Sequence, residues 1–188
     1  MNTDTANHVT NFTVPGINVL HADRIIGILQ QRLTALLDMQ LTLKHIHWNV
    51  VGPNFIAVHE MLDPQVDAVR EMSDTIAERI ATLGGVPTGT PGALVEHRGW
   101  NDYSLGKASA SEHLGALDVV YSGMNGSQRI AIQELGKLDP VSEDILIGDL
   151  AQLEQFQWFV RAHLESSKGE LPTAGLDDEQ AAAEAANA

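Results

Sequence analysis

The sequence predicts an all-α fold in which four long helices pack into one bundle. Apolar residues recur at alternating steps of three and four along four segments, which is the period of an amphipathic helix. Gly and Pro residues separate these segments, and no segment shows the two-residue alternation that is typical of a strand. The chain has 188 residues, enough to bury one core, so we expect a single domain.

The first helix is predicted to end at Gly52-Pro53, because this pair interrupts a regular stripe. A second apolar line follows another face, so we expect this helix to be covered on more than its core side. The stripe consists of Ile26, Leu29, Leu33, Leu36, Gln40, Leu43, His47 and Val50, and the second line of Leu37, Leu41 and Trp48.

The second helix carries its stripe from Leu62 to Leu83 and is predicted to stop at Gly84-Gly85. Pro64 lies inside this pattern and lacks an N–H group, so we expect it to kink the first turns. A connection rich in Gly and Pro follows, and we expect a short helix within residues 92–110 of it.

The third helix is predicted over residues 114–138 from the same spacing. The fourth helix begins near Asp139, which can act as the N-cap, with Pro140 at the first helical position. Its apolar positions continue to Gly169. The sequence therefore divides into an N-terminal segment (1–15) expected to be flexible, the bundle (16–168), and an acidic C-terminal tail (169–188) expected to be disordered.

The charge distribution argues against direct DNA binding. The formal net charge is −14, the first sixteen residues contain no Lys or Arg, and no basic residue follows Lys168. A protein that displaces counterions from DNA needs an exposed basic surface. The chain also has neither a signal-peptide pattern at its start nor an apolar run long enough for a membrane span, which favours a cytoplasmic location.

The absence of Cys limits any metal site to nitrogen and oxygen ligands. His47 lies on the apolar stripe of the first helix, where a lone His is usually a core residue. The second helix carries two pairs at a spacing of four, His59 with Asp63 and Asp74 with Glu78. Residues four apart share a helix face, so each pair can present two ligand atoms to one ion.

A single chain cannot bring both pairs to one metal, because the eleven residues between Asp63 and Asp74 span about 16 Å of helix. The two pairs nevertheless share one midpoint on the helix. A two-fold axis through that point would place His59 and Asp63 of one chain opposite Glu78 and Asp74 of the other. The alternative is a solvated acidic face with incidental pairing. No Glu-x-x-His motif occurs, so the di-iron site that such motifs build inside one bundle is not available.

The stretch KHIHWNVVGPNFIAVHEMLD followed by DTIAER, within residues 44–85, closely resembles the Dps family of mini-ferritins. The helical pattern extends the resemblance over residues 16–167, and FQWFVRAHLES resembles the last helix of actinobacterial members. The resemblance implies a ferritin-like bundle that assembles into a hollow dodecamer, oxidises Fe(II), preferably with hydrogen peroxide, stores the ferric mineral and protects against oxidative damage.

The family's ferroxidase centre lies between two-fold-related subunits and takes two irons. The resemblance places it on His47, His59 and Asp63 of one chain with Asp74 and Glu78 of the other. Trp48 resembles the family's tryptophan beside the centre, an electron donor or an interface residue. His45 points away from His47 and is left outside the site.

The resemblance also implies carboxylates at an iron-uptake pore. Asp139, Glu143 and Asp144 are the candidates, and N-capping with a solvated first turn explains them equally well. Two other functions stay open: metal-dependent hydrolysis of an amide or ester at the same site, and non-enzymatic DNA compaction. Hydrolysis would proceed without an oxidant, and compaction would need the basic arm that this sequence lacks.

Overall fold

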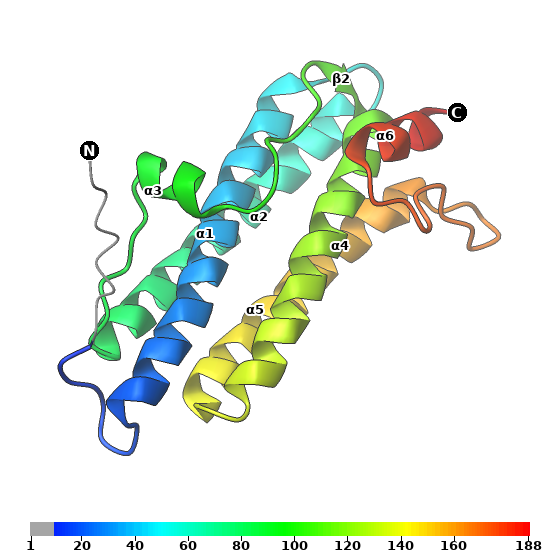
Figure 1. Cartoon of the computed structure of the whole chain (residues 1–188). Coiled ribbons are helices and arrows are strands. Elements are labelled where there is room, and N and C mark those ends of the chain that lie inside the picture. Colours follow the sequence, from blue (N-terminus) through cyan, green and yellow to red (C-terminus); the bar gives the residue numbers. More distant parts are fainter. Residues whose placement is uncertain (1–9) are drawn as a thin grey trace.

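A computed structural model describes residues 10–188 and shows the predicted all-α four-helix bundle. Helix α1 (Val19–Asn49) forms a hairpin with α2 (Phe55–Thr82), and α4 (Ala110–Leu135) forms a second hairpin with α5 (Pro140–Leu164). The short helix α3 (Pro91–His97) lies in the long connection between the hairpins and crosses α1 (Figure 1).

The core lies where the four long helices face one another. Fully buried side chains come from all of them, including Leu36, Ile76, Tyr121 and Leu153. The Tyr121 hydroxyl donates a hydrogen bond to Gln65 Oε1 at 2.6 Å, so this buried polar group has a partner. The apolar spacing in the sequence therefore identified the faces that pack together.

Side chains that cap the first turn fix where the helices begin. Asp139 accepts hydrogen bonds from two backbone N–H groups of α5 and precedes Pro140, as predicted. Helix α4 begins earlier than predicted, because Ser109 and Glu112 form a capping box. Helix α5 ends at Leu164, earlier than the expected Gly169, and α2 is continuous through Pro64.

One feature of the connection was not predicted. Val50 and Val51, directly after α1, form a two-residue strand β1 that pairs in parallel with β2 (Ala108–Ser109), directly before α4. This short ladder joins the two hairpins at one end of the bundle.

The C-terminal tail is not disordered as expected. Residues 179–187 form helix α6 (Glu179–Asn187), which packs against α4 and buries Ala182 and Ala183 (Figure 1). The contact depends on Gly115 of α4, since a Cβ there would lie 2.4 Å from the Ala182 carbonyl oxygen. Composition alone failed here because charge and alanine content do not reveal a docking surface on a distant helix.

The N-terminal segment is described only in part. Residues 1–9 of the segment expected to be flexible lie outside the described residues. Thr10 is buried, and its backbone N–H donates to Asp23 Oδ1 at 3.0 Å, so the described part of the segment is attached to α1. Among residues 10–188, no helix combines the length and apolar character needed to cross a membrane.

Candidate metal centre

The turn between α1 and α2 brings His47 and His59 together. The chain reverses over Gly52 and Asn54, which both take positive φ angles. The imidazole rings then stack with their centroids 3.5 Å apart. Each ring Nδ1 lies 2.9 Å from the backbone carbonyl oxygen of the other histidine.

These reciprocal bonds determine which nitrogen of each ring is free. A carbonyl oxygen only accepts, so each Nδ1 must carry the proton and donate it. The lone pair of each ring then lies on Nε2, the form in which a histidine binds a metal while its other nitrogen is held by the protein. Each imidazole of this pair is thus held in place by the other residue's backbone carbonyl.

Asp63 lies one helical turn beyond His59 and joins the same cluster. Its Oδ1 lies 3.3 Å from His47 Nδ1 and 3.0 Å from Lys44 Nζ. The hydrogen bond from Lys44, aided by the nearby imidazoles, lowers the pKa of the Asp63 carboxyl although partial desolvation acts in the opposite direction. The Asp63 carboxyl is therefore ionised, and its side chain is exposed.

The structure thus gathers three of the five predicted ligands. Asp74 and Glu78 lie farther along α2, where both are exposed to solvent. Within residues 10–188 of one chain, no group of three or more His, Asp or Glu side chains is arranged to hold a metal ion by itself. A single chain carries one half with two imidazoles and an acid, and a separate half with two acids.

Large apolar side chains are exposed on α1 and at the start of α2. Trp48 is 70 % exposed and Leu41 58 % exposed, and Phe55 makes an edge contact with His59. Exposed apolar groups that gather on one face favour association with another surface. The sequence predicted that this side of α1 is covered, whereas within one chain Leu41 and Trp48 leave it exposed.

His45 takes part in packing, consistent with leaving it outside the site. Its Nε2 lies 2.8 Å from the Leu105 carbonyl oxygen, and its ring makes an edge contact with Tyr103. This imidazole joins α1 to the connection that leads into α4.

The three candidate pore acids differ in their surroundings. Asp139 is buried, caps α5 and pairs with Arg79 Nη2 at 2.6 Å, so its carboxylate already has partners. Burial alone would raise the pKa of Asp139, but hydrogen bonds from Ser142 and Arg79 and the Arg79 charge outweigh it and lower the pKa. N-capping therefore describes Asp139 within one chain, and its place at a pore stays a prediction. Asp144 is exposed and Glu143 half-buried, so both remain predictions.

Sequence reasoning missed Lys44 as part of this cluster. Its ammonium group neutralises Asp63 and also lies 5.9 Å from the centre of the Trp48 ring. The signal was its position three residues before His47, which places both side chains on one face of α1.

Comparisons with known proteins agree with this architecture. Residues 26–169 match the family described as "Ferritin-like domain". The chain is 52 % identical over 178 residues to a "DNA protection during starvation protein" of Mycolicibacterium smegmatis, which covers 95 % of this chain and 97 % of that protein. It is 51 % identical over 159 residues to the "Fine tangled pili major subunit" of Haemophilus ducreyi, covering 85 % and 84 %.

The solved structure of DpsA14 from Streptomyces coelicolor superposes with a TM-score of 0.86 at 65 % identity. The match covers 87 % of this chain and 97 % of that one.

Proposed function

The chain belongs to the Dps family of ferritin-like proteins, and on this premise we propose that it oxidises Fe(II) and stores the ferric product inside a dodecameric shell. The observation that carries the proposal is the pair of imidazoles, each fixed by the other's carbonyl with Nε2 free, beside the ionised Asp63. Imidazole and carboxylate bind Fe(II) firmly enough to position it, yet they release Fe(III) to a growing mineral.

The site is completed by a second chain. Asp74 and Glu78 share a midpoint on α2 with His59 and Asp63, so a two-fold-related copy sets its acids opposite the histidines. The exposed Trp48 and Leu41 lie on the face that such a copy would cover. The dimer then holds two equal sites, each with His47, His59 and Asp63 from one chain and Asp74 and Glu78 from the other.

Two irons at each site balance the reaction. Each of two Fe(II) ions loses one electron, the O–O bond of one hydrogen peroxide breaks, and two hydroxide ions form. Because both electrons reach peroxide at one place, no hydroxyl radical is released. Trp48, next to His47 in sequence, can supply an electron when only one iron is present, and it also contributes to the subunit contact.

Protection of DNA, as named in the relative from Mycolicibacterium smegmatis, would here follow from removal of Fe(II) and peroxide. Every chain adds a formal charge of −14 to the shell, and neither end of the sequence has a basic arm. Close approach of two polyanions is unfavourable, so chemical protection is preferred over direct contact. Glu143 and Asp144 remain the proposed acids along the iron path into the shell.

The first experiment loads the protein with Fe(II) under anaerobic conditions, adds one pulse of peroxide, and records ferric absorbance together with particle mass. We expect rapid oxidation by a dodecamer. The Asp74→Asn/Glu78→Gln variant should lose this oxidation and keep its helical content. The matched control is Glu165→Gln/Glu170→Gln, which makes the same charge change on exposed acids far from this stripe of α2 and should stay active.

Subunit mixing then tests the shared site. Chains with His47→Ala/His59→Ala are disassembled and reassembled with chains carrying Asp74→Asn/Glu78→Gln. Each mixed dimer should regain one of its two sites. If verified mixed dimers stay inactive, the shared-site proposal is wrong.

A further inference from the structure

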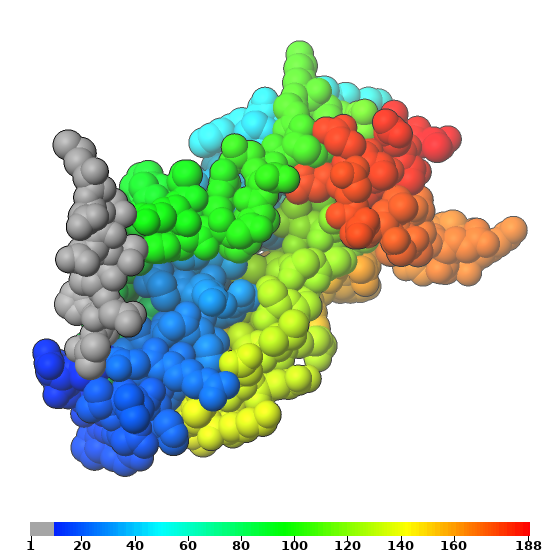
Figure 2. Space-filling view, in the orientation of Figure 1, coloured from blue at the N-terminus to red at the C-terminus, as the bar shows by residue number. Residues whose placement is uncertain are grey.

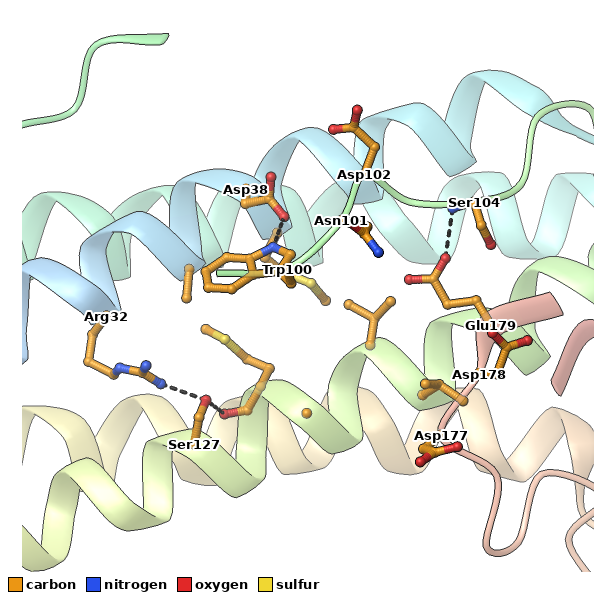
Figure 3. A pocket seen from close by; sticks show the side chains of 16 residues that line it. Arg32, Asp38, Trp100, Asn101, Asp102, Ser104, Ser127, Asp177, Asp178 and Glu179 are labelled. Carbon is orange, nitrogen blue, oxygen red and sulfur yellow. Dashed lines mark hydrogen bonds between the residues drawn. The ribbon is translucent and has the colours of Figure 1, made fainter. Parts of the chain in front are cut away.

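A cavity of about 480 Å³ lies between the two hairpins, away from the histidines. Helices α1 and α4 form its sides, and residues 100–104 and 177–179 border it (Figure 3). Figure 2 shows that α6 and the connection after α3 lie over this end of the bundle. The volume is in the range of small-molecule sites, which are about 300–1,000 Å³.

The cavity contains one buried cation, the guanidinium of Arg32. Arg32 of α1 is 8 % exposed, and among residues 10–188 it forms no ion pair. Its one hydrogen bond runs from Nη1 to Ser127 Oγ at 2.6 Å, and its Nε is buried without a partner. Burial lowers the pKa of the guanidinium, which nevertheless remains charged at neutral pH.

Such an arrangement is costly unless something compensates it. A guanidinium offers five N–H donors, and a buried charge without an acceptor loses its hydration. A carboxylate accepts two of these donors side by side, which is the strongest pairing available to Arg.

The rest of the cavity defines the body of the ligand. Its apolar walls are formed by Ala35, Met39, Trp100, Val119, Val120 and Met124. Two acids also border it, Asp38 and Asp102, and both are paired with Arg98. Figure 3 shows Arg32 at one end and the acids Asp177, Asp178 and Glu179 at the other. The acids disfavour a second negative charge at that end.

We propose that this cavity binds a small monocarboxylate with an apolar body, whose carboxylate pairs with Arg32 and whose body lies against Met39, Met124 and Trp100. The site is separate from the metal centre and uses none of the five metal ligands. It would give the shell a second, organic ligand.

The test is titration calorimetry of the assembled protein with octanoate, octanamide and suberate. These probes share one chain length and carry one, no and two carboxylates. Octanoate should bind at one site per chain. The neutral amide should bind at least about tenfold more weakly than octanoate, because it loses the charged hydrogen bonds. The dicarboxylate should also bind at least about tenfold more weakly, because its second carboxylate meets the acids.

Two variants remove the site in different ways. Arg32→Met removes the cation and should raise the dissociation constant of octanoate by about tenfold or more. Gly123→Leu keeps Arg32 but adds a side chain to the cavity wall, where a Cβ would meet no atom within 4 Å. Its control is Gly126→Leu on the same helix, which has equally open space, does not border the cavity, and should leave affinity unchanged.

Three results would overturn the proposal. The first is that octanoate fails to bind the dodecamer. The second is equal binding of octanoate and octanamide, unaffected by Arg32→Met, which would show apolar association without the cation. The third is that Arg32→Met reduces particle mass, which would assign the guanidinium to a contact between subunits.

Discussion

The contact between α4 and α6 predicts a specific effect of one methyl group. Gly115 lies where the two helices meet, and a Cβ there would be 2.4 Å from the Ala182 carbonyl oxygen and 2.7 Å from the Ala186 Cβ. Both distances are too short for unbonded atoms, so Gly115→Ala must push α6 away from α4. The tail should detach while the bundle stays folded.

The magnitude follows from two opposing effects. Forcing a methyl group into a packed contact costs about 1–3 kcal/mol. Alanine also favours α4 by about 1 kcal/mol relative to glycine, but this gain stabilises α4 whether or not α6 is docked. Undocking of α6 should therefore become easier by the full packing cost, which is about 5- to 150-fold in the equilibrium constant.

Hydrogen exchange followed by mass spectrometry measures this directly. Peptides covering residues 179–187 should exchange faster in Gly115→Ala, with little change in peptides from α1 and α2. Gly126→Ala is the control, because it has the same gain in helix propensity and no atom within 4 Å of the new Cβ. Equal exchange of α6 in both variants would refute the reasoning.

Three further predictions concern other parts of the bundle. Burial raises the pKa of Asp149 to about 7, so its folded form keeps a proton that the unfolded chain releases near pH 4. The stability that this proton contributes is complete below about pH 4 and is lost as the pH rises to about 7. The free energy of unfolding of Asp149→Asn, measured in urea, should therefore equal that of the parent in acid and exceed it by up to about 4 kcal/mol above pH 7. Arg79→Met leaves the buried Asp139 carboxylate without its cation and should lower the free energy of unfolding by about 3 kcal/mol. Adding Asp139→Asn should restore part of this loss, and an unchanged unfolding midpoint in Arg79→Met would contradict the ion-pair argument. Leu41→Glu places a charge on the exposed apolar face beside Trp48 and should reduce both particle mass and Fe(II) oxidation while helical content by circular dichroism is retained; a full-sized active shell would contradict this interface.

Local periodicity was sufficient to predict the four long helices. The stripes of α1 and α2 identified buried faces, and the Asp139-Pro140 pair identified the start of α5. The sequence named His47, His59 and Asp63 together, and in the structure His47 contacts both of the others. Completion of the site by Asp74 and Glu78 stays a prediction, because a single chain does not contain the partner.

Features that depend on distant residues could not be predicted in this way. Helix α6 has good helix formers, but its order depends on Gly115, which is far away in the sequence. Asp139 gave the correct signal for a cap, yet its pairing with Arg79 joins residues of different hairpins. The pairing of β1 with β2 likewise joins segments separated by two helices and gives no periodic signal.

The division of the bundle into two hairpins has a consequence for the order of folding. Each hairpin packs along its whole length, whereas α1 meets α4, and α2 meets α5, at few places. Contacts within a hairpin are close in sequence and form fast. Contacts across the seam, which is the boundary between the two hairpins, form only after long loops have closed. We expect the hairpins to form first and the seam last. Arg79 and Asp139, β1 and β2, and the lining of the Arg32 cavity would then be the final parts of the molecule to become native.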